Sequence, residues 1–155
     1  MLSVPSVFKM KRALGIDHGE ARIGLAISDD LGMLAHPLET IHLKTVPDPL
    51  ARIAEIVARD QIGMIVLGLP RNMNGTYGPA SEKVKEFAEK LRTKVPCEIK
   101  LWDERLTSVA AQRSLHEAGR NVKNSRDVID QVAAQLILQG WLDSQAMFGN
   151  VGDSP

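Results

Sequence analysis

Three acidic residues in distant parts of this 155-residue chain have the type and the surroundings of metal ligands. Asp17 and Glu104 follow apolar stretches that are typical of strands, and Asp130 lies near the start of a predicted helix. Carboxylate oxygens without a His or Cys cluster form a hard donor set, which favours Mg²⁺ or Mn²⁺. Two such ions about 3.5–4 Å apart can hold the attacking and the leaving oxygen of a phosphodiester. The pattern therefore indicates a two-metal site in which Asp17 bridges the ions while Glu104 and Asp130 each hold one.

Two of these acids also have an interpretation without chemistry. Asp17 belongs to an Asp-x-Gly sequence at a strand end, which is a common turn device. Glu104 lies between Asp103 and Arg105, as in a surface ion-pair cluster of little energetic weight. His18, directly after the first acid, is either a proton shuttle or a turn histidine that faces solvent.

The last predicted helix makes the metal interpretation stronger. Asp130 is followed at helical spacing by Ala134 and Ile137, so it lies on a face that continues as small and apolar. A carboxylate that faces a sheet is costly unless it is paired or bound to a cation. Asp127 lies three residues earlier on the same side and is a candidate further ligand, but the helix dipole alone would also favour an acid there.

A hairpin over residues 14–28 positions the first acid. Apolar residues alternate with small or polar ones along both predicted strands, which is the period-two pattern of a sheet. Asp17 therefore shares a face with Gly24, Ala26 and Ser28. This small-residue floor suits the close approach of a helix, a phosphate or a metal.

The remaining elements follow from periodicity, caps and breakers. A third strand is expected over 38–43, a helix over 48–60 with Asp48-Pro49 as its start, a buried strand over 64–68, a loop over 69–79, a helix over about 79–92, a strand over 98–102, a helix from Thr107 or Ser108 to Ala118, a polar loop over 120–125 and a last helix from Arg126 to about Ser144. Three antiparallel strands followed by helix–strand units predict an α/β mixed sheet, whose ligands bind at the carboxyl ends of its strands. In the last helix, the apolar positions expected to face the core are Ile129, Val132, Ala133, Leu136, Ile137 and Trp141.

Composition limits the class of protein. The length fits one domain over residues 1–155, with an ordered core at about 10–144 between a flexible leader and tail. The formal net charge is +0, so any field that attracts nucleic acid must be local, which counts against a tight non-specific DNA binder. The single cysteine, Cys97, fits a reducing compartment. With no apparent signal peptide or membrane span, we expect a soluble cytoplasmic protein that does not contact a membrane.

The predicted loop over 69–79 has two interpretations. Its Asn74-Gly75-Thr76 sequence is typical of a simple turn. Its backbone donors, together with Arg71 and the start of the following helix, could equally hold a backbone phosphate. Because the loop follows a strand that ends beside two of the acids, phosphate binding is slightly favoured.

Four sequence motifs in order make the chain resemble the bacterial YqgF (RuvX) family over about residues 13–143. They are Gly15-Ile16-Asp17-His18-Gly19 with Arg22-Ile23-Gly24, Gly68-Leu69-Pro70 with Met73-Asn74-Gly75-Thr76, Trp102-Asp103-Glu104-Arg105-Leu106-Thr107-Ser108, and Asp130-Gln131-Val132-Ala133-Ala134 with Ile137-Leu138-Gln139. The resemblance implies an RNase H-like mixed five-stranded sheet with helices on both faces, related to the Holliday-junction resolvase RuvC.

The same resemblance implies a divalent-metal nuclease that trims the 5′ end of the small-subunit ribosomal RNA precursor, pre-16S rRNA. The family's acidic positions fall on Asp17, Glu104 and Asp130, and a further acid of related resolvases falls near Asp127. The loop before the last helix is often more basic in the family. The residues expected to contact RNA are Arg71, Asn74, Gly75, Thr76, Arg105, Arg120, Lys123 and Arg126.

Rival functions remain open from sequence. A Holliday-junction resolvase acting on branched DNA needs two active sites in a symmetric dimer, whereas an RNA-trimming enzyme can act as a monomer or a homodimer. A non-catalytic RNA-binding factor in ribosome assembly would not need all three acids. A phosphotransferase of the actin–hexokinase type would need a second Asp-x-Gly hairpin, which the chain lacks.

Overall fold

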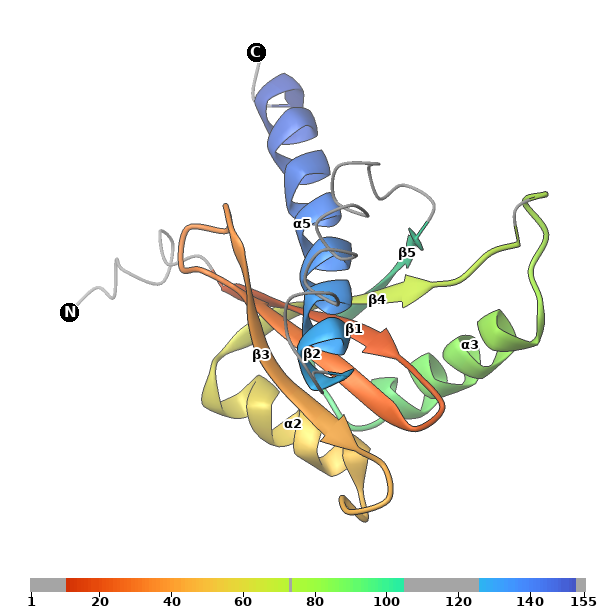
Figure 1. Ribbon diagram of the computed structural model, residues 1–155. Coiled ribbons are helices and arrows are strands. Elements are labelled where there is room, and N and C mark those ends of the chain that lie inside the picture. Colours follow the sequence, from red (N-terminus) through yellow and green to blue (C-terminus); the bar gives the residue numbers. More distant parts are fainter. Residues whose placement is uncertain (1–10, 73, 105–125, 153–155) are drawn as a thin grey trace.

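A mixed five-stranded sheet forms the centre of the computed structural model, which describes residues 11–72, 74–104 and 126–152 (Figure 1). The elements are β1 (Arg12–His18), β2 (Arg22–Ser28), β3 (Ala35–His42), α2 (Pro49–Arg59), β4 (Ile62–Leu69), α3 (Pro79–Arg92), β5 (Glu98–Asp103) and α5 (Arg126–Gly152). The strand order is β3-β2-β1-β4-β5. The first three strands pair antiparallel, and β4 and β5 join them in parallel, which confirms the predicted mixed sheet.

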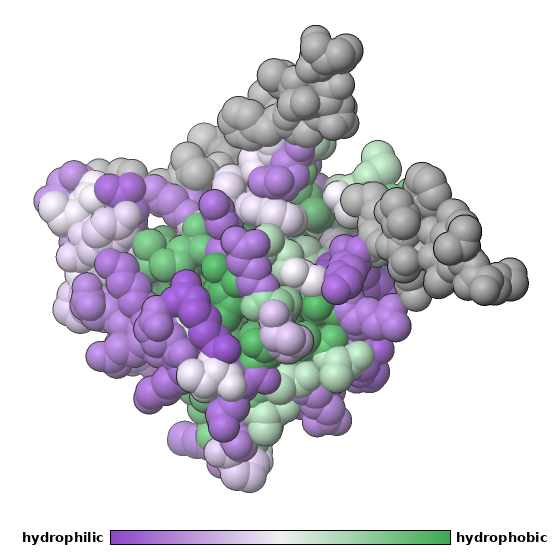
Figure 2. All heavy atoms as spheres, turned by 180° about the vertical axis from the view of Figure 1, so that it is seen from behind, coloured by the Kyte–Doolittle hydropathy of each residue, from purple (hydrophilic) through white to green (hydrophobic). Residues whose placement is uncertain are grey.

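Helices cover both faces of this sheet, as predicted. On one face, α2 and α3 pack on a core that includes Ile16, Leu25 and Leu67, all fully buried. On the other face, α5 packs on small residues such as Ala13 and Ala26. From behind the view of Figure 1, apolar side chains gather in the middle of the surface within a border of hydrophilic ones (Figure 2).

Two glycines of the hairpin allow α5 to lie directly on the strands. A Cβ atom added to Gly15 would lie 2.8 Å from the carbonyl oxygen of Ala134, and one added to Gly24 would lie 2.1 Å from that of Asp130. Residues 130, 134 and 138 are one turn apart, so a single stripe of the helix rests on the glycines. The predicted small-residue floor is thus the seat of the last helix.

The buried stripe of α5 differs from the predicted one. The buried positions are Ala134, Ile137, Leu138 and Leu142. Of the predicted core positions only Ile137 is among them, and the other five are partly buried. The stripe is set by where the sheet lacks side chains, which the helix sequence alone does not show.

Element ends also differ from prediction. β3 begins at Ala35 rather than residue 38, because Pro37 reads as a strand breaker but is tolerated on this edge strand. α5 continues to Gly152, eight residues beyond the predicted end at Ser144. The predicted helix over 107–118, the loop over 120–125 and the leader lie outside the described residues. Within the described part of the chain, no helix is long and apolar enough to cross a membrane.

The crossover helices begin where the sequence indicated. Asp48 caps α2 by accepting a hydrogen bond from the Ala51 amide at 3.1 Å, and Pro49 occupies the first turn. α3 likewise begins at Pro79. These helices return the chain so that β1, β4 and β5 run parallel and end at the same edge of the sheet.

Candidate functional site

Asp17 lies at the carboxyl end of β1, opposite Gly24 of β2. The alternation along β1 directs its side chain to the face that α5 covers. Burial, followed by the charges of Glu104 and Asp130, raises the pKa of the Asp17 carboxyl to about 7. The structure therefore brings the three predicted acids into one electrostatic neighbourhood, although they come from three distant segments.

Glu104 directly follows β5 at the same edge of the sheet. A Cβ atom on Gly68 of β4 would lie 2.8 Å from its carboxylate Oε1, so the absent side chain leaves room for this acid. Burial, followed by the charge of Asp103, raises the pKa of Glu104. Gly68 of β4 thus makes room for the Glu104 carboxylate.

Asp130 lies in the second turn of α5, where the backbone touches Gly24. Its carboxylate Oδ2 accepts a hydrogen bond from Arg22 Nε at 2.8 Å, and both side chains are about three-quarters buried or more. Because the backbone is held against the sheet, the direction of the carboxylate depends on this arginine. The motif that contains Arg22 does not indicate this role, because the pairing across 108 residues leaves no local signal in the sequence.

The three acids fit a divalent metal by donor chemistry. Their oxygens are hard ligands, and a cation among them would relieve the repulsion and desolvation that hold the pKa of Asp17 near 7. Within the described residues, however, no three His, Cys, Asp or Glu side chains lie close enough to enclose an ion. Asp130 must turn from Arg22, or share it, in order to join such a set.

Asp127, the predicted further ligand, faces another partner. Its Oδ2 lies 2.9 Å from Nε2 of His42, and its carbonyl oxygen accepts a hydrogen bond from the Thr40 hydroxyl at 2.8 Å. These contacts fasten the start of α5 to the edge strand β3. Asp127 does not contribute to the raised pKa of Asp17.

The loop after β4 is closed by its own hydrogen bonds. Arg71 donates to the Gly75 carbonyl and forms a 3.0 Å ion pair with Asp103. The side-chain oxygen of Asn74 accepts from both the amide and the hydroxyl of Thr76. Gly75 has a φ of 87°, which favours glycine. Much of the predicted phosphate-binding capacity is thus used within the turn, while the Asn74 and Thr76 side chains remain exposed.

The other predicted contacts divide into two groups. Arg126 is exposed at the first position of α5. Arg105, Arg120 and Lys123 lie outside the described residues. His18 is not simply a turn histidine that faces solvent. The centroid of its ring lies 4.5 Å from that of Phe87, and burial lowers its pKa.

Comparison with known proteins places this site in context. The chain matches a family model described as "RuvX: Holliday junction resolvase" over residues 11–144. A Clostridium botulinum protein named "Putative pre-16S rRNA nuclease" is 48% identical over 133 residues, 86% of this chain and 97% of the relative. An Acetivibrio thermocellus protein of the same name is 47% identical over 136 residues, 86% of this chain and 96% of the relative.

A solved structure has the same fold. T. thermophilus RuvC in complex with Holliday junction substrate superposes with a TM-score of 0.57 at 15% identity, covering 91% of this chain and 96% of that one. At this identity the likeness concerns the fold alone. It confirms the predicted RNase H-like arrangement.

Proposed function

The chain belongs to the RuvX family, and from this premise we propose that it is a divalent-metal-dependent nuclease that hydrolyses RNA phosphodiester bonds in 5′-end processing of pre-16S rRNA. The names of its closely similar relatives support the reaction and the substrate. We expect it to act in the cytoplasm on ribosomal precursor particles, as one domain over the whole chain.

One observation carries the proposal. A partly buried carboxylate at a strand end, whose pKa is raised to about 7 by burial and by the charges of two further acids, is costly to the fold and is not explained by packing. Such groups gather where a cation or reacting group is to be bound. Asp17 is therefore the centre of the site, and Glu104 and Asp130 complete it.

Each residue has a proposed role. Asp17, Glu104 and Asp130 would hold Mg²⁺ or Mn²⁺, with Asp17 shared between two ions. When bound, the ions would stabilise charge that develops on the phosphate oxygens. Arg22 neutralises Asp130 before a cation arrives. Asp127, which lies against His42, remains a candidate further ligand that would have to change partners.

The test is cleavage of a pre-16S rRNA fragment in Mg²⁺ or Mn²⁺ by the wild type and by Asp17→Asn. We expect product only from the wild type, and none in EDTA. Asp143→Asn is the matched control, because this exposed aspartate lies on α5 and accepts a hydrogen bond from Gln139 of the same helix. Equal cleavage by the Asp17 variant would disprove the mechanism, and RNA binding without any cleavage would favour an assembly factor.

The loop after β4 has a separate test. Asn74→Ala should weaken RNA binding while leaving the fold, because its side chain is exposed. Gly75→Ala would also strain the turn, so it is less informative alone. Unchanged affinity of the Asn74 variant would assign the loop a purely structural role. Arg105, Arg120, Lys123 and Arg126 are the further proposed RNA contacts.

A second candidate, resolution of branched DNA, is favoured by the description of the family model. It requires two sites on a symmetric dimer. Two measurements distinguish the resolvase from the RNA-processing nuclease. Sedimentation gives the oligomeric state, and cleavage assays compare a four-way junction with linear precursor RNA. A monomer that cuts RNA and leaves the junction intact excludes the resolvase.

A further inference from the structure

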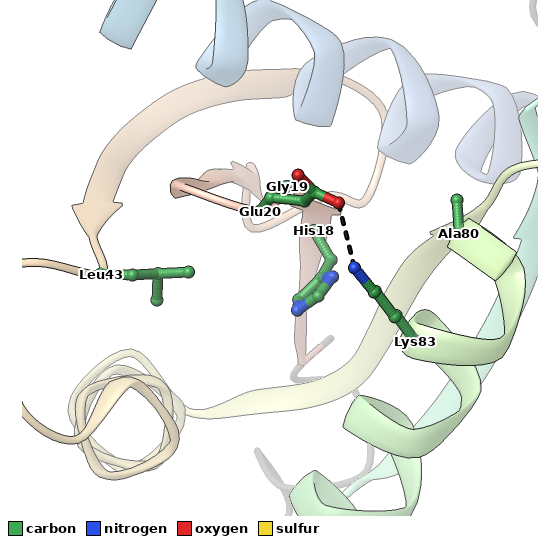
Figure 3. A pocket seen from close by; sticks show the side chains of 6 residues that line it. All are labelled: His18, Gly19, Glu20, Leu43, Ala80 and Lys83. Atoms are coloured by element: carbon green, nitrogen blue, oxygen red, sulfur yellow. Dashed lines mark hydrogen bonds and ion pairs between the residues drawn. The ribbon is translucent and has the colours of Figure 1, made fainter.

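A pocket of about 320 Å³ lies beside the candidate site, on the other face of the sheet (Figure 3). It is lined by His18, Gly19, Glu20, Leu43, Ala80 and Lys83. The first three form the end of β1 and the hairpin turn, Leu43 follows β3, and the last two belong to α3. Three segments thus meet at one edge of the sheet.

The pocket and the acids are neighbours across the hairpin. Side chains alternate along β1, so Asp17 is directed to the α5 face and His18 to the α3 face. The turn between the strands is tight, with the Gly19 amide donating to the Arg22 carbonyl at 2.9 Å. A Cβ atom on Gly19 would lie 2.7 Å from the same carbonyl oxygen, so the glycine allows the turn to be this tight. Only this short turn separates the acids from the pocket, and it is the path that a strand bound at both would take.

The lining has two chemical parts. The His18 imidazole rests against the Phe87 ring, and the partly buried Leu43 and the exposed Ala80 add apolar surface. At the rim, the Lys83 ammonium lies 3.0 Å from the Glu20 carboxylate, and Figure 3 shows this pair beside the imidazole. The two side chains of the pair are 58% and 86% exposed, so the pair is weak and the ammonium can exchange its partner.

This combination matches one nucleotide. An aromatic and apolar interior suits the face of an unpaired base, and a cation at the rim suits its phosphate. The volume lies near the lower end of ligand sites, about 300–1,000 Å³, which is consistent with a single nucleotide. The nearby Glu20 would discourage an anion unless Lys83 is released from it.

We propose that this pocket binds one unpaired nucleotide of the RNA strand next to the cleaved phosphate, its base against His18 and its phosphate at Lys83. The proposal rests on the proposed nuclease function. It makes His18 and Lys83 determinants of which single-stranded segment is cut.

The experiment measures binding without cleavage. A fluorescein-labelled 12-nucleotide single-stranded RNA is titrated with the full-length protein in EDTA, and fluorescence anisotropy gives the affinity. We expect His18→Ala and Lys83→Met each to weaken binding about tenfold, the scale of one lost base stack or phosphate contact. Lys85→Met is the matched control, because this lysine lies on the same helix but over the Tyr77 ring, outside the pocket. It should change affinity less than twofold.

Base removal at successive positions then tests the contact itself. For the wild type, removal of the base at one position should weaken binding about as much as His18→Ala does with intact RNA. The His18→Ala variant should bind this abasic RNA no more weakly than either change alone predicts. His18→Phe should again bind the abasic RNA more weakly than the intact RNA, because it keeps a ring against Phe87. Thermal melting of each variant verifies folding, and the exposed Lys83 provides an answer if the His18 variant is unstable.

The contrary outcomes are distinct. The proposal would be overturned if the losses of affinity from His18→Ala and from base removal were additive at every abasic position. It would also be overturned if the Lys83→Met variant bound RNA as tightly as the Lys85→Met variant. Competition by a free nucleoside monophosphate at the affinity of the oligonucleotide would assign the pocket to free nucleotide instead. If the wild type cleaves RNA but shows no coupling, only the pocket assignment fails; if it cleaves none, the proposed function fails.

Discussion

At the scale of single residues, the charge state of Asp17 is the property with the clearest consequence. Its carboxyl has a pKa of about 7 in the folded protein, against an ordinary value of 3.8. The folded state therefore binds more protons than the unfolded state between these two values. Stability must then fall as the pH rises through this range.

The first prediction follows from that sign. Metal-free protein should lose a few kcal/mol of unfolding free energy between about pH 4 and pH 7, since one pKa unit corresponds to about 1.4 kcal/mol. Asp17→Asn should flatten the dependence, because an amide does not ionise. Urea denaturation at several pH values measures it. A variant with the same slope as the wild type would show that another group is responsible; Glu104, whose pKa is also raised, is the next to replace.

The second prediction concerns Arg22. Arg22→Gln should destabilise the metal-free protein by about 2 kcal/mol, because it leaves the largely buried Asp130 carboxylate without its ion pair. It should also tighten Mn²⁺ binding in calorimetry, because the cation no longer competes with the guanidinium.

Arg52→Gln is the control for Arg22. Arg52 pairs with Glu39 at 2.7 Å and similar exposure, but away from the acids. Its loss should destabilise the protein without changing the Mn²⁺ affinity. Weaker Mn²⁺ binding by the Arg22 variant would mean that the arginine orients Asp130 for the metal rather than competing with it.

At the scale of elements, the contact between α5 and the hairpin determines where Asp130 lies. The third prediction is that Gly24→Ala destabilises the fold by about 3 kcal/mol, because the new Cβ would meet backbone rather than a movable side chain. It should also abolish metal-induced stabilisation by shifting the helix. Gly78→Ala is the control, since its Cβ would lie no closer than 3.5 Å to any neighbour. Thermal unfolding with and without Mn²⁺ compares the two variants. Equal melting temperatures of the Gly24 and Gly78 variants would contradict the close packing of α5 on Gly24.

Elements with local signals were predictable from sequence. The hairpin, α2, the buried β4 and α3 carry alternation, caps or apolar runs, and the structure has them at the expected places. Features set by other segments were not. Pro37 obscured the start of β3, and the buried stripe of α5 depends on Gly15 and Gly24.

The candidate site divides in the same way. The three acids could be predicted as a site because a carboxylate at a strand end or on an apolar helix face destabilises the fold unless it is paired or binds a cation. Their partners did not stand out, because Arg22 with Asp130 and Asp127 with His42 are joined only by the folded sheet. The pocket at His18 likewise needs α3 and the end of β3 to exist.

At the scale of the whole molecule, the fourth prediction concerns cation binding. A ligand that binds only the folded state stabilises it by an amount that grows with concentration, about 2.7 kcal/mol at a hundred times its Kd. Mn²⁺ or Mg²⁺ should therefore raise the melting temperature, more at pH 8 than at pH 6, because protons compete for Asp17 below its pKa. Asp17→Asn should remove the effect, and Ca²⁺-free buffer with EDTA gives the baseline. A shift of the same size in the Asp17 variant would locate the ion elsewhere.

The pairing of Arg22 with Asp130 across 108 residues also has a consequence for synthesis of the protein. A chain that grows from its amino end makes Asp17 first and the helix that carries Asp130 more than a hundred residues later. Until α5 is complete and seated on the glycines, the acids are not assembled. A site built from these acids would thus be unable to cut RNA until α5 has been made and has folded onto the sheet.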